Sequence, residues 1–357
     1  MVQKTHKKAV KMYAKSEGNF KTGSGMPLKK ESDLSLFYYP GIIGILEKIQ
    51  ANPESQKKYC VHHKTIGVIS TRPSSYYPLL SARAGLLSEV AGVNAIPLLL
   101  RYENLNNLPA LLDQLSLNFQ MMIASDLKPL EKAMIREAYK EKDYPLFFTD
   151  ELQAAAVITA LHSASKMLKK TLKKARVTIE GDDELLEEVI QMLQKEQVEN
   201  LTLLDEKGPL YEKRPNMNKR KNQLVQALKL RKDQRTREEV LSETDLYISA
   251  TTDDIGASVT QHLPEKAVII SLKSHRIEKK SKQSLISTLP HLPNHLTDLH
   301  IAVGLASALK EGKKIKPASL GQAIKGLQSV FKSPKQNKLF PGLLEKKLAQ
   351  KIAKMIK

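Results

Sequence analysis

Residues 175–205 read ARVTIEGDDELLEEVIQMLQKEQVENLTLLD, and this stretch decides the fold class of the chain. ARVTIEG at 175–181 and NLTLLDEKG, which begins at Asn200, are short apolar runs of the kind that forms buried strands. Residues 183–196 lie between them and carry apolar side chains at helical spacing. A strand, a helix and a second strand in this order predict parallel pairing, because the helical crossover carries the chain back over the sheet.

The same alternation of strands and helices extends in both directions. Two more strands are expected downstream, at 245–251 and 267–273, with a helix near 216–231 before them and a last amphipathic helix at 342–357. Upstream, four apolar runs are expected to be strands, and they begin at Lys64 (KTIGVIS), Asn94 (NAIPLLL), Phe119 (FQMMIA) and Tyr144 (YPLFF). Between them, helical spacing is found at 103–116 and 128–141.

These elements predict an α/β protein with two domains. One long helix, from about 153 to 170, stands between the two series of strands. We expect an N-terminal α/β domain over 1–160 and a doubly wound, Rossmann-like parallel-sheet domain over 161–290. The remaining helices, over 291–357, are expected to pack back and close the two-domain body.

The chain is strongly basic. It has 57 Lys and Arg residues against 38 Asp and Glu residues, a formal net charge of +19. Such a potential attracts phosphates, nucleic acids or acidic partners over long range. The basic residues are scattered, however, and the chain has no Trp and only 5% aromatic residues, which disfavours stacking platforms for single strands. We therefore expect a lysine-rich solvated surface, with nucleic acid or another polyanion as the alternative partner.

The sequence also gives an expectation for the cellular compartment of the protein. Cys60 is the only cysteine, which excludes an internal disulfide framework and a multi-cysteine metal site. No apolar run approaches the roughly 20 residues that span a bilayer. The basic start of the chain lacks the apolar stretch of a secretory signal. We expect a cytoplasmic protein with no membrane association.

Five motifs carry a resemblance to a known family. DLSLFYYPGI at 33–42 is similar to the signature D-L-S-L-x-Y-x-P-G-V, and AGVNAIPLLL at 91–100 is similar to A-G-V-D-A-F-P. Three further motifs follow in the family's order: YPLFFTDELQ (144–153), LLDEKGPLYEKRPNMN (203–218) and LPNHLTD (292–298). The chain thus resembles the malic enzymes over nearly its whole length.

The resemblance implies oxidation of malate by NAD(P) and then metal-assisted decarboxylation to pyruvate, with NAD(P) and Mg²⁺ or Mn²⁺ as cofactors. It also implies a homo-oligomer, which we expect to be a dimer. This chemistry needs a base for the hydroxyl, a cation to hold the enolate charge and an acid for the enol. It also needs a glycine-rich turn that lets the diphosphate approach a helix N-terminus.

The catalytic positions are only partly kept. Tyr38 falls on the position of the family's acid, although a tyrosine there could instead pack beneath the Pro-Gly turn. LLSEVAGV places Ser88 where the resemblance implies a lysine base, and a serine cannot accept a proton near neutral pH without a neighbouring base. Arg83 covers another usual lysine position but stays protonated. Glu89 is adjacent to Ser88 and would point elsewhere.

The metal ligands are reduced in number. Ser125 replaces the glutamate of the first acidic pair, and Asp126 is kept. Thr149 replaces the first aspartate of the second motif, and Asp150 is kept. Two carboxylates with waters and substrate could hold magnesium weakly. Alternatively, both aspartates are helix caps or surface charges.

The dinucleotide turn is largely lost. Of its three glycines only Gly181 remains, and Asp183 and Leu186 stand at the positions of the others. Side chains there block a close backbone approach, and the acidic residues repel a diphosphate. Asp205 keeps the place at the end of the second strand where an acid would meet a ribose.

Other active-site motifs have changed as well. Asn294 is kept from P-N-Q-x-N-N and is the remaining candidate catalytic residue of that motif, whereas Thr297 and Asp298 replace its asparagine pair. ATTDD at 250–254 replaces the S-A-P-G turn near the nicotinamide, and the glycine-rich loop is shortened to STRPSSYYPLL at 70–80.

Three functions follow from these observations. The leading hypothesis is a malic-enzyme-like pseudoenzyme with a structural or partner-binding role. The alternative is an active but atypical NAD(P)-dependent oxidative decarboxylase of malate. The second alternative is a basic scaffold that binds RNA or another polyanion.

Overall fold

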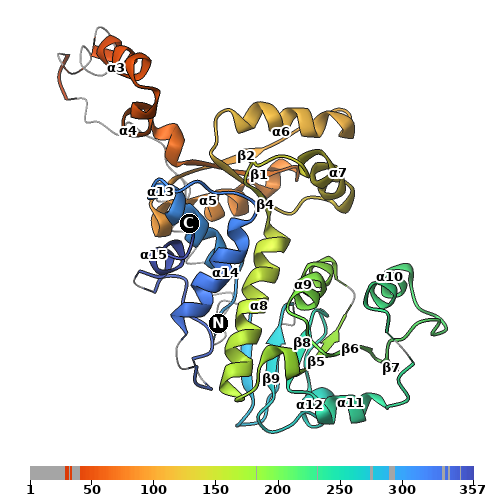
Figure 1. The fold of residues 1–357 in the computed structure, drawn as a ribbon. Coiled ribbons are helices and arrows are strands. Elements are labelled where there is room, and N and C mark those ends of the chain that lie inside the picture. The colour runs from red at the N-terminus through yellow and green to blue at the C-terminus, as the bar shows by residue number, and fades with distance from the viewer. Residues whose placement is uncertain are drawn as a thin grey trace. The chain divides into compact units, whose positions relative to one another are not determined.

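A computed structural model describes residues 29–31, 33, 41–181, 183–230, 232–273, 276–288, 294–331, 334–336, 338–345 and 347–357. The chain forms two compact units (Figure 1). The first unit comprises Met1–Phe148 and Ala306–Pro317, and the second comprises Thr149–Leu305 and Ala318–Lys357. None of the helices in the described ranges combines the length and apolar composition needed to cross a bilayer.

The first unit is built on a four-stranded parallel sheet in the order β2-β1-β3-β4. Its strands are β1 (Thr65–Ser70), β2 (Asn94–Leu99), β3 (Met121–Ala124) and β4 (Leu146–Phe148). The crossovers are α5 (Tyr77–Ala91), α6 (Leu108–Ser116) and α7 (Pro129–Tyr139), and α3 (Gly41–Ala51) and α4 (Gln56–Tyr59) precede the sheet. Every residue of β1 and β3 is buried, because helical crossovers cover both faces of a parallel sheet.

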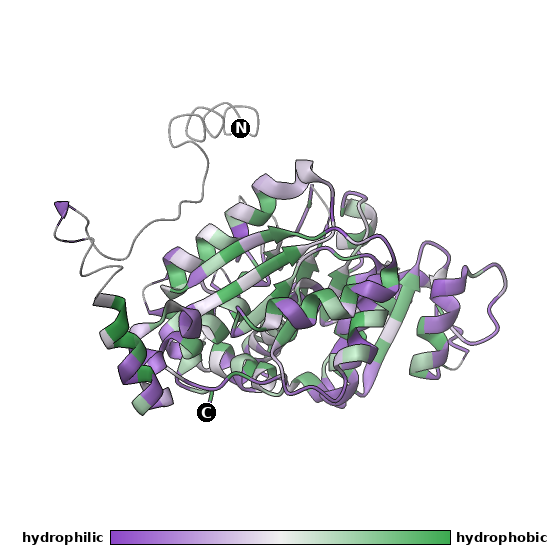
Figure 2. Cartoon of the chain, turned by 90° about the horizontal axis from the view of Figure 1, so that it is seen from above, coloured by the Kyte–Doolittle hydropathy of each residue, from purple (hydrophilic) through white to green (hydrophobic). Residues whose placement is uncertain are grey.

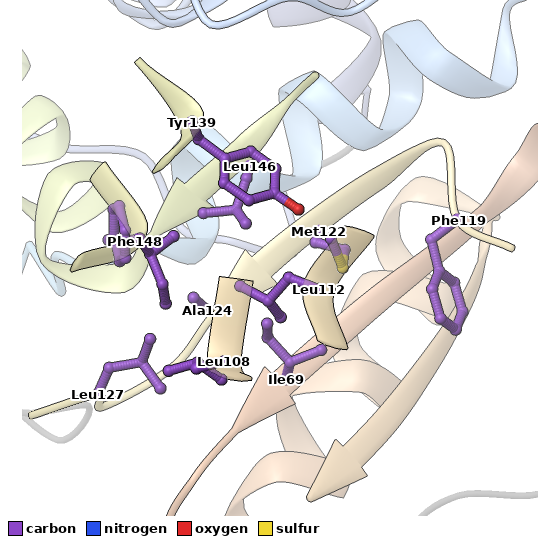
Figure 3. Packing of buried hydrophobic residues seen from close by; sticks show 11 residues of the cluster. Ile69, Leu108, Leu112, Phe119, Met122, Ala124, Leu127, Tyr139, Leu146 and Phe148 are labelled. Atoms are coloured by element: carbon purple, nitrogen blue, oxygen red, sulfur yellow. The ribbon is translucent and has the colours of Figure 1, made fainter. Parts of the chain in front are cut away.

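The core of this unit lies between the sheet and the pair α6 and α7. Figure 3 shows side chains from β1, β3 and β4 meeting those of the two helices. The buried cluster consists of Ile69, Leu108, Leu112, Phe119, Met122, Ala124, Leu127, Ile135, Tyr139, Leu146 and Phe148.

A short segment from far along the chain completes the first unit. Residues 306–317 belong to it although they follow most of the second unit in sequence. Lys316 pairs with Asp143 at 2.6 Å, and Lys314 lies 3.6 Å from the same carboxylate. These ion pairs join the segment to the loop that precedes β4.

The second unit contains a six-stranded sheet in the order β10-β9-β8-β5-β6-β7. Its strands are β5 (Arg176–Glu180), β6 (Asn200–Asp205), β7 (Gly208–Pro209), β8 (Leu246–Ser249), β9 (Val268–Ser271) and β10 (Ser284–Ser287). All pairs are parallel except β6 with β7. The stretch that opens the sequence analysis therefore forms β5, a helix and β6, as predicted.

The helices from α8 onward extend to the C-terminus. They are α8 (Thr149–Met167), α9 (Glu184–Lys195), α10 (Lys219–Leu228), α11 (Arg237–Glu243), α12 (Ala257–Thr260), α13 (Leu299–Lys310), α14 (Ser319–Val330) and α15 (Leu348–Ala353). The last residues of α13 belong to the first unit. The predicted α/β class and the doubly wound parallel sheet are both confirmed. The helix predicted over 342–357 is shorter, since α15 is the one α-helix among the described residues of this range.

Strand order creates a crevice in the second unit. From β5 the chain proceeds to β6 on one side, and it later returns to β8 on the other side. The loops after β5 and β8 therefore diverge at the carboxyl edge of the sheet, which is where ligands bind in open α/β folds.

Close packing of α14 on α15 requires glycine at position 326. A Cβ atom added to Gly326 would lie 2.7 Å from the backbone oxygen and 2.9 Å from the Cα of Ile352. We expect Gly326→Ala to lower the free energy of unfolding by about 1–3 kcal/mol, because the two helices must move apart. Urea unfolding measures the change.

Gly321 in the same helix is the matched control, because nothing lies within 4 Å of its added Cβ. Gly321→Ala should stabilise the protein by up to about 1 kcal/mol through helix propensity. Equal effects of the two substitutions would contradict this packing.

Candidate functional site

Polar side chains gather at the carboxyl edge of the sheet in the first unit. Ser70 ends β1, and Ser125 and Asp126 follow β3 directly. The Ser70 hydroxyl donates to the backbone oxygen of Ser125 at 2.8 Å. Ser125 is fully buried, and Asp126 has a φ of 51°, in the left-handed region. Asp126, the predicted metal ligand, and its neighbour Ser125 therefore lie in the turn that the Ser70 side chain contacts.

A tyrosine that the sequence analysis missed fills this turn. The Tyr76 hydroxyl donates to Oδ2 of Asp126 and lies 3.2 Å from the Ser125 hydroxyl. The Ser125 hydroxyl donates to the same Oδ2 at 2.9 Å, and Nε of Arg72 donates to the backbone oxygen of Asp126 at 2.7 Å. Burial and the neighbouring Asp126 carboxylate raise the pKa of Tyr76 to about 12.

Arg83, and not Ser88, is the position on α5 that faces this turn. The Ser88 hydroxyl accepts the backbone N–H of Ala95 at 3.1 Å, which places it at the start of β2 and so at the opposite edge of the sheet. The charge of Arg83 acts on the Tyr76 hydroxyl and favours its ionisation. Glu89 is exposed near the end of α5. An arginine near the turn supplies positive charge but cannot accept a proton.

Of the other two predicted residues of this site, one is outside the described part of the chain and one is in the second unit. Tyr38, the candidate acid, lies outside the described residues. Asp150 is the second residue of α8 and belongs to the second unit.

The turn does not fit a divalent cation. Ser125 contributes no charge, and Oδ2 of Asp126 already accepts two hydroxyl protons. Within the described ranges, no group of three His, Cys, Asp or Glu side chains is arranged to hold a metal ion. Mg²⁺ and Mn²⁺ prefer several oxygen ligands that include carboxylates.

The second unit has a cavity of about 380 Å³ at its carboxyl edge. Glu180, Gly181, Asp205, Arg237, Tyr247 and Asp254 are among its lining residues. It lies at the crevice where a doubly wound fold would hold a nucleotide. Its volume would accept a small ligand.

After the turn between β5 and α9, a carboxylate of the chain itself, that of Asp183, caps the helix N-terminus. Asp183 is the N-cap of α9, and its Oδ1 accepts the backbone N–H of Leu185 at 2.9 Å. Lys273 forms an ion pair with Oδ2 of the same residue. Leu186 is fully buried, so it packs in the core beside the turn. The N-terminus of α9 therefore has an internal anion where a dinucleotide fold would place a phosphate.

Gly181 keeps the conformation that the turn needs. Its φ is 123°, and an added Cβ would lie 3.2 Å from the backbone carbon of Ala250. Glu184 and Glu187 follow in the first turn of α9. Acidic side chains at this end of the helix satisfy its dipole and repel a diphosphate.

Asp205 is used in an internal ion pair. Nη2 of Arg214 lies 2.8 Å from its Oδ1, and Nζ of Lys221 lies 3.0 Å from its Oδ2. Burial opposes ionisation of Asp205, but hydrogen bonds from Lys221 and Arg214 more than offset it and lower the pKa. The acid kept at the ribose position is thus neutralised by the chain.

The floor of the cavity holds another buried acid. Glu180 is only 7% exposed, pairs with Arg237 at 2.8 Å and accepts the Tyr247 hydroxyl. Burial raises the pKa of Glu180, while Tyr247 and Arg237 oppose the rise. The sequence did not predict this cluster, because a single glutamate at the end of a strand does not indicate which distant residues will contact it.

Asn294 joins backbone segments of the second unit. Its Nδ2 donates to the backbone oxygen of Leu285 at 2.8 Å, and its Oδ1 accepts the N–H of Leu339 at 2.7 Å. Oδ1 also lies 3.3 Å from the N of Phe340. The side chain of this candidate catalytic residue therefore makes structural hydrogen bonds with both of its polar atoms.

No model of a known protein family matches the chain. Among curated proteins, the bifunctional malic/malolactic enzyme of Bacillus subtilis is 23% identical over 256 residues, which are 68% of this chain and 62% of that protein. The probable NADP-dependent malic enzyme of Rickettsia prowazekii is 28% identical over 255 residues, 67% of this chain and 32% of that protein. The chain spans about a third to three fifths of the length of the curated relatives it matches.

Solved structures show the same fold. The NAD-dependent malic enzyme of Thermotoga maritima has a TM-score of 0.80 at 19% identity, and 98% of each chain is covered. The malic enzyme of Entamoeba histolytica has a TM-score of 0.81 at 16% identity, over 99% of this chain and 81% of that one.

The parallel sheets and the crevice at the β5–β8 switch define a mixed α/β protein with a Rossmann-type unit. In sequence the chain is similar to malic enzymes at 23% and 28% identity, and its fold is that of solved malic enzymes.

The ion pairs of Asp205 generate a prediction about stability and pH. Asp205→Asn should lower the free energy of unfolding at pH 7 by about 2 kcal/mol, because Arg214 and Lys221 lose a charged acceptor. The folded-state pKa of Asp205 is lowered, so its stabilisation is complete above its unfolded pKa near 3.9 and is lost as pH falls through the folded value. The difference in the free energy of unfolding between variant and wild type should therefore become smaller below about pH 4.

Urea unfolding at a series of pH values from neutral to acidic measures this difference. The control is Glu206→Gln at the exposed neighbouring position, which should change stability by less than about 0.5 kcal/mol. A difference for Asp205→Asn that stays constant through acidic pH would show that its ion pairs are not the cause.

Proposed function

We propose that this protein is a malic-enzyme-like pseudoenzyme with a structural or partner-binding role. The observation that carries the proposal is the Asp183 carboxylate at the N-terminus of α9, paired with Lys273. A dinucleotide diphosphate would have to displace this ion pair and then face the acidic side chains of the first turn. The cofactor on which the family's redox chemistry depends would have no favourable place.

The first unit supports the same proposal. Near the Ser125–Asp126 turn, the residue on α5 that acts on Tyr76 is Arg83, which cannot serve as a general base. Asp126 accepts hydrogen bonds from two hydroxyls, which leaves it poorly placed to bind a cation. Proton abstraction, metal binding and cofactor binding would therefore all be weakened, each by residues at a different place in the chain.

The two alternative functions would require other features of the protein. An atypical NAD(P)-dependent decarboxylase of malate would need a water molecule or Glu89 as base and a cofactor pose without the glycine turn. A polyanion-binding scaffold would rest on the net charge of +19, and its affinity would fall steeply with salt.

Isothermal titration of the protein with NADH, with and without malate and Mn²⁺, tests the proposal. We expect no saturable binding at millimolar cofactor and no turnover of malate with NAD or NADP. The NAD-dependent malic enzyme of Thermotoga maritima serves as the positive control. Saturable NADH binding with turnover would establish the atypical enzyme instead, and salt-sensitive retention on a polyanion column would favour the scaffold.

An exposed apolar helix supports a partner-binding role. No residue of α3 is buried, and Ile42, Ile43 and Leu46 are 36%, 39% and 51% exposed. Figure 2 shows this helix as largely hydrophobic over its first turns. Apolar side chains grouped on one helix are typical of interaction sites. We propose that α3 packs against a second copy of the chain in a homodimer.

Light scattering after size exclusion tests the dimer. The wild-type protein should be dimeric at micromolar concentration, and Leu46→Asp should raise the dimer dissociation constant by about tenfold or more, as loss of one apolar anchor does. Leu117→Asp is the control, because Leu117 is 70% exposed outside α3. A wild-type monomer, or equal effects of the two substitutions, would contradict the proposal.

A further inference from the structure

We infer that the Tyr76 hydroxyl occupies, at the Asp126 carboxylate, the position that a divalent cation would take. Tyr76, Ser125 and Asp126 then form a tyrosine latch that joins two loops of the first unit without a metal. This inference deepens the proposed loss of activity. Its tests measure metal binding and stability, so they can fail independently of any assay of turnover.

The short connection between β1 and α5 places Tyr76 at the latch. Only residues 71–76 separate Ser70, the end of β1, from the first residue of α5. Ser74–Tyr76 form a 3-10 turn after Pro73 that runs directly into the helix. Of the two adjacent tyrosines, Tyr76 turns inward to the latch, whereas Tyr77 is 43% exposed.

Hydrogen-bond capacity excludes a cation from the same oxygen. Oδ2 of Asp126 accepts protons from both Tyr76 and Ser125. A carboxylate oxygen offers about two lone-pair directions, so two hydroxyl donors fill them. A cation bound at this oxygen would have to displace at least one hydroxyl.

The surrounding charges act in the same direction. Nε of Arg72 donates to the backbone oxygen of Asp126, and the positive charge of Arg83 reaches Tyr76. Positive charge at this turn opposes the binding of a second cation such as Mg²⁺ or Mn²⁺. A neutral donor such as a tyrosine hydroxyl meets no such repulsion.

In such a latch, hydrogen bonds between side chains take the place of a cross-link through a metal ion. A cation would join loops through carboxylates on both sides, and would be lost to a chelator. The tyrosine joins the loop after β1 to the turn after β3 by side chains alone. The first unit should therefore have the same stability with or without divalent cations.

The first experiment is a double-mutant cycle on the midpoint of urea unfolding, with Tyr76→Phe, Asp126→Asn and both together. If the two side chains are bonded, the effects of the single substitutions will not add, and the double variant will resemble the more damaging single one. Tyr77→Phe is the matched control and should leave the midpoint unchanged. Additive single effects would overturn the latch.

The second experiment measures Mn²⁺ binding through the electron paramagnetic resonance signal of the free ion. Wild-type protein and Tyr77→Phe should leave Mn²⁺ free at millimolar concentration. Tyr76→Phe combined with Ser125→Glu removes both hydroxyl donors to Asp126 and supplies a second carboxylate, and should raise the Mn²⁺ affinity by about tenfold or more.

Thermal unfolding provides the remaining check on the same proteins. Neither a chelator nor added Mn²⁺ should move the wild-type midpoint, because a ligand that does not bind the folded state does not stabilise it. Tight Mn²⁺ binding by the wild type that Asp126→Asn abolishes would overturn the inference. A folded double variant that binds Mn²⁺ no better than the wild type would overturn it as well.

Discussion

Parallel pairing is the constraint on which the rest of this structure depends. Every strand of the first sheet, and all but β7 of the second, must be followed by a crossover before the next parallel strand can pair. The carboxyl ends of neighbouring strands consequently meet at one edge, together with the loops that leave them. The Ser125–Asp126 turn and the Gly181–Asp183 turn both lie at such edges.

At the carboxyl edge of the second sheet, contacts that could have been made to a ligand are made within the chain. Asp183 caps α9 and pairs with Lys273, and Asp205 is shared by Arg214 and Lys221. An ion pair of this kind costs desolvation, but removal of one partner costs more because the other charge is left alone. Each of these acidic side chains is therefore matched by a basic side chain of the same unit.

The sequence was sufficient to predict the fold, because the patterns that identify strands and helices are local in sequence. Apolar runs and helical spacing identified β5, α9 and β6, and the family motifs added the order of the elements. The candidate site depended on contacts across long sequence separations, which periodicity does not report. Tyr76 reaches Asp126 from 50 residues away, and Arg237 reaches Glu180 from 57. Ser88 was aligned by motif, yet its hydroxyl bonds Ala95 at the far edge of the sheet.

The return of residues 306–317 to the first unit has a consequence for how this molecule can be divided. The chain passes from one unit to the other three times, after Phe148, Leu305 and Pro317. A gene fragment that ends at the first of these points would lack the lysines that pair with Asp143. Neither half can be excised by a single cut, so recombination or proteolysis at one junction would damage both halves at once.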